Sequence, residues 1–86
     1  MPGFYVHISK SVLKDLSKIP LPWHDRLRVA IDFLEGEPFY GEKMSGEHRH
    51  KYKIVVWPYR ILYRVDKDAK LVEILEVGHR GGMSYK

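Results

Sequence analysis

Three positively charged side chains, Lys53, Arg60 and Arg80, lie beside strand-like segments in the second half of this sequence. Lys53 and Arg60 stand on either side of Trp57 and Pro58, so a tight turn there would bring both cations to the same end of a hairpin. Arginine binds phosphate through a planar pair of N–H donors, and two cations can stabilise the charge that develops when a ribose 2'-oxygen attacks a phosphodiester. The candidate chemistry is therefore RNA cleavage that needs no metal ion or other cofactor.

Such a reaction also needs a base for the 2'-hydroxyl and an acid for the departing 5'-oxygen. A lysine such as Lys53 can act as a base only if burial or neighbouring cations favour its neutral form. Histidine exchanges protons near neutral pH without such help, so His79, His50 and His48 are equally good candidates. Tyr85 can donate a proton, stack on an unpaired base, or do both. The residue types leave the identity of the base open.

The excess of positive charge is concentrated in one segment. Residues 43–64 contain six basic residues and a single acidic one. Such a segment attracts phosphate backbones or an acidic partner. The candidate RNA-binding residues are Arg49, His50, Lys51, Trp57 and Arg64. In an ordinary alternative, Arg60 or Arg80 pairs with Glu73 or Glu76 on a neighbouring strand, which would neutralise the charge that catalysis needs.

Size and composition restrict the class of protein. A chain of 86 residues forms one domain, with 15 Lys and Arg against 11 Asp and Glu for a net charge of +4. No cysteine is present, which excludes disulfides and thiolate metal sites and is compatible with a reducing compartment. No stretch has the length and hydrophobicity of a signal peptide or membrane span. We expect a soluble cytoplasmic protein without a membrane partner.

The first half of the chain predicts a strand followed by two helices. Phe4, Val6 and Ile8 alternate with polar or aromatic residues, and Ser9 is a good N-cap for a following helix. The apolar stripe of this first helix is Val12, Leu13, Leu16 and Ile19. After Pro20 and Pro22, a second helix is indicated by Trp23, Leu27, Ala30, Ile31 and Leu34.

The second half predicts three antiparallel strands. Residues 41–50 carry turn formers and charge, and we interpret them as a loop that enters a strand near Lys51. The nearly continuous apolar run over residues 71–77 suits a strand buried on both faces in the sheet interior. The expected fold class is α+β, with order βααβββ, a largely antiparallel four-stranded sheet, and both N-terminal helices packed on one face. The other face would remain free for a groove.

Three motifs fall at the ends of these strands: Tyr52-Lys53-Ile54, Tyr59-Arg60-Ile61-Leu62-Tyr63 and Gly78-His79-Arg80. The arrangement resembles the RelE/ParE toxin superfamily, most closely its RNA-cleaving RelE-like branch, over nearly the whole chain. The resemblance implies a type II toxin–antitoxin system with a cognate antitoxin. It also implies mRNA cleavage in the ribosomal A site, leaving a 2',3'-cyclic phosphate and a 5'-hydroxyl. The residues that inherit catalytic roles by this resemblance are Lys53, Arg60, Arg80 and Tyr85.

One position departs from the resemblance. Some members carry a second lysine two residues after the first, where this chain has Val55. Two alternatives therefore stay open: a ParE-type inhibitor of DNA gyrase, and an inactive relative that binds RNA or an antitoxin. The combination of Arg60, Arg80 and Tyr85 favours the nuclease. Homo-oligomerisation is also open, because an apolar groove edge could bind an antitoxin helix or a second copy.

Overall fold

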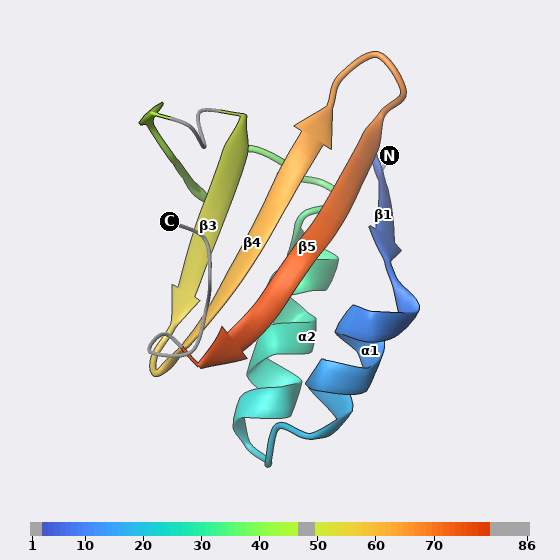
Figure 1. The fold of residues 1–86 in the computed structure, drawn as a ribbon. Helices are drawn as coiled ribbons and strands as arrows, with labels where there is room; N and C mark the ends of the chain where they lie inside the picture. The colour runs from blue at the N-terminus through green and yellow to red at the C-terminus, as the bar shows by residue number, and fades with distance from the viewer. Residues whose placement is uncertain (1–2, 47–49, 80–86) are drawn as a thin grey trace.

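Two helices pack on one face of a five-stranded mixed sheet in the computed structural model of this chain, which describes residues 3–46 and 50–79 (Figure 1). The elements are β1 (Tyr5–Ile8), α1 (Lys10–Ser17), α2 (Trp23–Phe33), β2 (Glu42–Lys43), β3 (Lys51–Val56), β4 (Tyr59–Asp66) and β5 (Leu71–His79). The strand order is β1-β5-β4-β3-β2, and β1 is parallel to β5 while the other neighbouring pairs are antiparallel. The predicted α+β class is confirmed.

The sheet has one more strand than the sequence indicated. Residues 41–50 were expected to form a loop, but Glu42 and Lys43 pair with Lys53 and Tyr52 of β3 as the two-residue strand β2. Two residues cannot show the alternation by which a strand is recognised. The strand forms because β3 offers an open edge, and the backbone N–H of Met44 continues the pairing by donating to the Lys51 carbonyl at 2.9 Å.

The predicted cap of the first helix is confirmed. The Ser9 hydroxyl accepts a hydrogen bond from the Val12 backbone N–H at 3.3 Å, which satisfies one of the free donors of the first turn. Val12 and Leu16, four residues apart, are buried against the sheet. Leu13 was expected in the same apolar stripe but is exposed. Consecutive residues of a helix are rotated by about a quarter of a turn, so Leu13 lies to one side of the face that Val12 buries.

The core lies between the helices and the sheet. Its members come from both helices, the C-cap of α2 and the three central strands: Val12, Leu16, Leu27, Ile31, Leu34, Ile54, Ile61, Tyr63, Val72, Ile74 and Val77. Burying each such side chain contributes about 1.5–3 kcal/mol before the entropy of ordering the chain is subtracted. No helix among residues 3–46 and 50–79 has the length and hydrophobicity needed to cross a membrane.

The apolar run in β5 has a different cause from the one predicted. The strand lies in the sheet interior, as expected, but Leu75 is exposed. The register between β4 and β5 shifts after Leu62, so that Leu62 faces Glu76 while Tyr63 faces Ile74. A bulge of this kind inserts one residue and resets the alternation. Ile74 and the core residue Val77 can therefore both face the helices, and one buried face accounts for the run.

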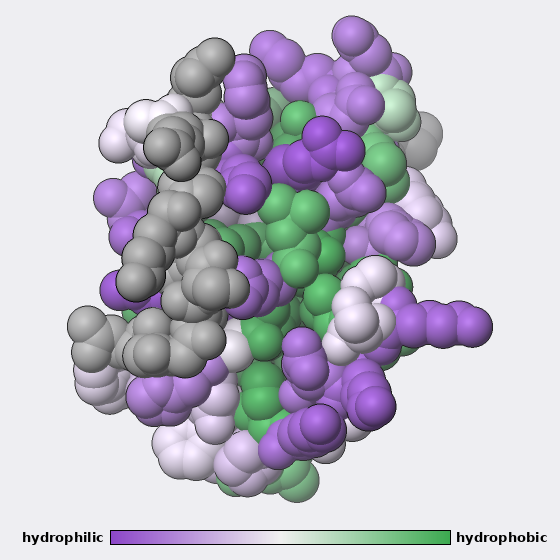
Figure 2. Space-filling model, in the orientation of Figure 1, coloured by the Kyte–Doolittle hydropathy of each residue, from purple (hydrophilic) through white to green (hydrophobic). Residues whose placement is uncertain are grey.

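The face of the sheet opposite the helices is here called the open face. Figure 2 views it directly and shows a hydrophobic patch surrounded by hydrophilic side chains. Strand alternation places Lys51, Lys53 and Val55 of β3 on this face, because Tyr52 and Ile54 between them pack toward the core. The Trp57–Pro58 peptide bond in the turn to β4 is cis.

Candidate functional site

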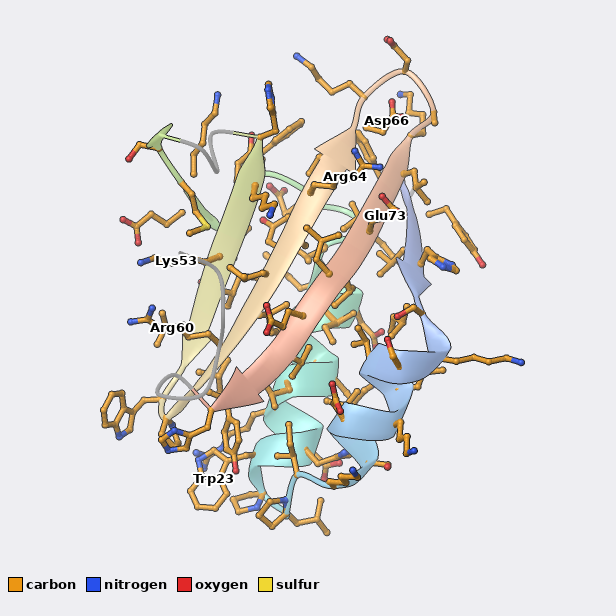
Figure 3. All side chains as sticks on the ribbon, viewed as in Figure 1. Trp23, Lys53, Arg60, Arg64, Asp66 and Glu73 are labelled. Atoms are coloured by element: carbon orange, nitrogen blue, oxygen red, sulfur yellow. The ribbon has the colours of Figure 1, made fainter. Side chains whose placement is uncertain are left out.

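Lys53 and Arg60 lie on the open face, on neighbouring strands. Lys53 is directly opposite Leu62, and Arg60 is two residues before Leu62 along β4, so the two cations are diagonal neighbours across the hairpin. Residues in this relation lie roughly 7–8 Å apart, a separation that a phosphate group can bridge. Figure 3 shows both side chains extending to the same side of the ribbon. The predicted approach of Lys53 to Arg60 is therefore present.

Two carboxylates share this face: that of Glu42, which the sequence did not indicate, and that of Glu76, which was considered as a partner for Arg60 or Arg80. The Glu42 carboxylate lies 3.9 Å from the Lys53 ammonium nitrogen and is largely exposed. Glu76 is paired with Leu62 from the β5 side, which puts it diagonal to Arg60. Glu42 could not be anticipated because β2 carries no sequence signal. Glu76 lies on the neighbouring strand, as the ordinary alternative for Arg60 supposed, and the bulge in β5 sets the face on which it lies.

A close contact beneath Lys53 fixes the position of β2. The Gly41 backbone N–H donates a hydrogen bond to the Tyr63 hydroxyl at 2.8 Å. A methyl group on Gly41 would meet that hydroxyl at 2.6 Å and the Lys53 carbonyl oxygen at 2.8 Å, so only glycine fits. Burial raises the pKa of Tyr63 to about 12, with the Gly41 hydrogen bond opposing this shift and nearby Tyr52 adding to it. Tyr63 therefore stays neutral and supports the strand edge beside Lys53.

The other end of the open face is organised differently. Arg64 donates from Nε to the Glu73 carboxylate at 2.6 Å, and Figure 3 shows the two side chains pointing toward each other. Lys51 is directly opposite Arg64 on β3. The expected neutralisation of an arginine by Glu73 thus occurs at Arg64. Lys51 and Arg64 were both predicted RNA contacts, and both lie on the face that carries Lys53.

His79 is not brought to the Lys53 and Arg60 pair. It is directly opposite Tyr59, and paired residues share a face, so the ring lies on the helix side of the sheet. The His79 and Tyr59 rings meet edge to face, with their centroids 5.8 Å apart. The centroid of the Trp23 ring of α2 lies 6.1 Å from that of the Tyr59 ring. The strand end would have to twist for His79 to reach a phosphate held by Arg60.

The remaining predicted residues divide into two groups. Trp57 is 64% exposed at the hairpin turn, and His50 is exposed just before β3. Arg49, His48, Arg80 and Tyr85 lie outside the described residues. Among the described parts of the chain, no three His, Cys, Asp or Glu side chains are grouped so that they could hold a metal ion.

Comparison with known proteins assigns the family. The model for the ParE toxin of the parDE type II toxin-antitoxin system matches residues 6–83. The chain belongs to this toxin family, within the RelE/ParE superfamily. No curated protein sequence matches this toxin chain.

Solved structures of RelE toxins share the fold. The RelBE2 toxin–antitoxin complex from Mycobacterium tuberculosis matches with a TM-score of 0.80 and 28% identity, covering 93% of this chain and 100% of that one. The archaeal RelE–RelB complex from Pyrococcus horikoshii matches with a TM-score of 0.76 and 27% identity, covering 94% and 99%. The isolated Escherichia coli RelE toxin, at 22% identity and a TM-score of 0.74 over 95% and 88%, shows the shared fold alone.

Proposed function

We propose that this toxin is an endoribonuclease that cleaves mRNA in the ribosomal A site without a metal ion and so inhibits translation. The observation that carries the proposal is the diagonal pair of Lys53 and Arg60 on the face of the sheet opposite α1 and α2. Two cations at this spacing match the two non-bridging oxygens of a phosphodiester. The function of the ribosome would be to present the mRNA in a geometry suited to in-line attack.

The chemistry requires one bond to form and one to break at phosphorus. The ribose 2'-oxygen loses its proton and attacks, while the 5'-oxygen of the next nucleotide leaves and takes up a proton, giving a 2',3'-cyclic phosphate and a 5'-hydroxyl. Arg60 binds the phosphate oxygens as negative charge builds up, and Lys53 neutralises that charge or accepts the 2'-proton. By family resemblance, Arg80 and Tyr85 complete the set of catalytic residues.

Val55 bears directly on this assignment. It stands where some family members have a second lysine, is 49% exposed, and lies opposite Arg60 on the same face as Lys53. A lysine at position 55 would therefore reach the same phosphate. Its absence leaves Lys53 as the one lysine of β3 next to Arg60, because Lys51 faces Arg64. The proposal consequently assigns Lys53 a larger share of the catalysis.

A cognate antitoxin is the proposed partner. The complexes from Mycobacterium tuberculosis and Pyrococcus horikoshii each contain a RelB-type antitoxin bound to the toxin. This chain has an apolar groove of about 290 Å³ between α2 and β3, lined in part by Val29, Phe33 and Val55. An antitoxin would cover such a surface, whether or not the toxin is a nuclease.

Gyrase inhibition is the second candidate function. The specific observation in its favour is that the matching family model is described by ParE, and not by RelE. A gyrase inhibitor would act by binding alone, so it would not depend on the placement of Lys53 beside Arg60. The two functions therefore differ in their sensitivity to substitution at these two positions.

The test is a translation reaction programmed with a defined mRNA, to which the purified toxin is added and in which primer extension maps the cuts. Arg60→Ala is the test variant, and Arg28→Ala, an exposed arginine on α2, is its control with the same change in charge. Removing a group that stabilises transition-state charge costs about 10²–10³ in rate. We expect ribosome-dependent cuts with wild type and Arg28→Ala, and almost none with Arg60→Ala.

Two results would overturn the nuclease assignment. Intact mRNA under active translation with the wild-type toxin would do so, and a DNA supercoiling assay would then test the gyrase alternative. Cuts that persist unchanged in Arg60→Ala would show that the cleavage arises elsewhere or from a contaminating nuclease.

A further inference from the structure

A second cationic site lies on the helix side of the sheet, away from Lys53 and Arg60. It is a pocket of about 190 Å³ lined by Phe39, Lys43, His50, Tyr52, Val65 and Lys67, here called the Phe39 pocket. No Asp or Glu of residues 3–46 and 50–79 lines it. Two lysines and a histidine around one small pocket, without a carboxylate, favour an anionic ligand.

Asp66, the residue before Lys67, does not line the Phe39 pocket. Its carboxylate accepts a hydrogen bond from the Ala69 backbone N–H at 3.0 Å within the turn. Asp66 is two residues after Arg64 on β4, so strand alternation places it on the open face with Arg64. Val65, between them, faces the Phe39 pocket on the other side of the sheet. Asp66 therefore does not neutralise the Lys67 charge at the pocket.

Two aromatic residues that line the Phe39 pocket, Phe39 and Tyr52, contact each other and further aromatic rings. Tyr52 stacks on the buried Tyr63 ring with centroids 5.4 Å apart and an interplanar angle of 18°. Phe39 packs against Tyr52 at 5.8 Å and against Phe4 at 6.2 Å, yet remains 46% exposed. A ring held by two aromatic neighbours with part of its surface open can stack on a flat ligand at little entropic cost.

Cations beside an exposed aromatic ring are the chemistry by which proteins bind single-stranded RNA, since cations hold the phosphates and aromatic rings stack on unpaired bases. We propose that the Phe39 pocket is an RNA-contact site, in which Lys43 and Lys67 bind a backbone phosphate while Phe39 stacks on an unpaired base. The proposal rests on the proposed function, because it takes RNA as the substrate. It adds a contact outside the Lys53 and Arg60 pair.

The position of β2 makes this arrangement feasible. Lys43 is paired with Tyr52 and shares the helix side of the sheet, while the adjacent Glu42 is paired with Lys53 on the open face. Because β2 is the outermost strand, only the edge of the sheet separates the two sites. Along β3, Tyr52 and Val55 opposite Arg60 are three residues apart, or roughly 10 Å at the usual rise per residue. One RNA strand that passes around β2 can contact both sites.

Binding of an uncleavable RNA tests the Phe39 pocket directly. The probe is a fluorescent single strand of about eight 2'-O-methyl nucleotides, which lacks the nucleophile, and its affinity is measured by anisotropy over a range of NaCl concentrations. The test variant is Lys43→Ala/Lys67→Ala. The control is Lys10→Ala/Lys14→Ala, which removes two exposed lysines from α1 and changes the net charge equally.

We expect the Lys43→Ala/Lys67→Ala variant to bind about tenfold more weakly near 0.1 M salt. The negative slope of the logarithm of its association constant against log salt should become shallower by about 0.7 for each lost phosphate contact. The control should bind within about twofold of wild type. Phe39→Leu should weaken binding at least about fivefold, since it removes a stacking surface. Thermal melting checks that each variant is folded, and the lysine pair decides the matter if Phe39→Leu is not.

Three outcomes would overturn the pocket proposal. The first is an equal loss of RNA affinity in the pocket variant and in the control. The second is binding of inorganic phosphate or adenosine monophosphate to the pocket as tightly as RNA, and the third is pocket-dependent binding of a polyglutamate peptide without binding of RNA. The cleavage assay keeps this proposal separate from the proposed function. Wild-type toxin that binds RNA through the pocket but cuts no mRNA contradicts only the nuclease. Toxin that cuts while the pocket variant behaves like its control contradicts only the pocket.

Discussion

Each end of the open face carries a lysine of β3, an arginine of β4 and a nearby glutamate, but the ion pairing differs between the two ends. Toward the hairpin turn, Lys53 is diagonal to Arg60, and the carboxylate of Glu42 approaches the lysine only to 3.9 Å. Toward the other end, Arg64 and Glu73 form a 2.6 Å ion pair with Lys51 beside it. Both arginines belong to β4 and point to the same side of the sheet, so strand geometry alone does not distinguish them.

What distinguishes the two ends is the neighbouring strand. Arg60 is paired with Gly78 on β5, which has no side chain, whereas Arg64 is paired with Glu73. Gly78 places no side chain directly opposite Arg60, whereas the Glu73 carboxylate accepts a hydrogen bond from the Arg64 Nε that a phosphate would use. In the proposed function, the residue directly opposite on β5 is what distinguishes Arg60, the phosphate-binding arginine, from Arg64.

The largest effect should separate the two lysines of β3 on this face. Lys53→Met and Lys51→Met remove the same charge from positions two residues apart, and methionine preserves much of the apolar side chain. We expect Lys53→Met to slow mRNA cleavage about 100-fold, because a proton-transfer or charge-stabilising group is lost, and Lys51→Met to slow it less than about threefold. Rates of cut formation in the translation reaction measure both. Equal losses would mean that the whole face binds RNA as a diffuse charge.

The sequence was sufficient for the features that repeat. Alternation and helical spacing located both helices and four strands, and Ser9 capped α1 as predicted, because each of these patterns spans several residues. The approach of Lys53 to Arg60 was also predictable, since a two-residue turn fixes the hairpin register. Local patterns with a fixed geometric consequence were therefore interpreted correctly.

The failures arose where tertiary contacts override local pattern. Strand β2 exists because of the β3 edge and the contact of Gly41 with Tyr63, neither of which leaves a period in the sequence. The bulge in β5 changes which side chains face the core, so the apolar run was interpreted as two buried faces. His79 follows Gly78, the partner of Arg60, and adjacent residues of a strand face opposite sides. The position of His79 in the sequence suggested that it lies beside Arg60, but strand alternation puts the two side chains on opposite faces of the sheet.

An intermediate effect is expected from the support beneath the hairpin end. Gly41→Ala places a methyl group against the Tyr63 hydroxyl and the Lys53 carbonyl, and we expect a loss of about 1–3 kcal/mol in the free energy of unfolding from overpacking. Gly36→Ala is the matched control, since nothing lies within 4 Å of the added atom, and it should change stability by less than about 1 kcal/mol. Urea unfolding measures both variants. Equal stability of the two would show that β2 adapts freely and does not set the Lys53 edge.

The smallest effect is expected from a substitution that makes the Arg64 end of the open face resemble the Arg60 end. Glu73→Gln removes the negative charge beside Arg64 but keeps the size of the side chain, so Arg64 becomes available to a phosphate. The ion pair is partly exposed, with the Arg64 side chain at 56% and that of Glu73 at 31%, and its loss should cost less than about 1 kcal/mol in stability. We expect affinity for the uncleavable RNA to rise about two- to threefold, and the salt slope to increase in magnitude by up to about 0.7.

The control for this change is Glu37→Gln, which removes an equal charge from an exposed position that precedes β2. A general increase in positive charge would raise the affinity of both variants equally, and that result would contradict the role given to Glu73. A gain confined to Glu73→Gln, with mRNA cleavage still dependent on Lys53, would show that Arg64 can bind RNA yet is held out of the site by its strand neighbour. The difference between the two arginines would then be a property of β5, since Gly78 and Glu73 are the residues that set it.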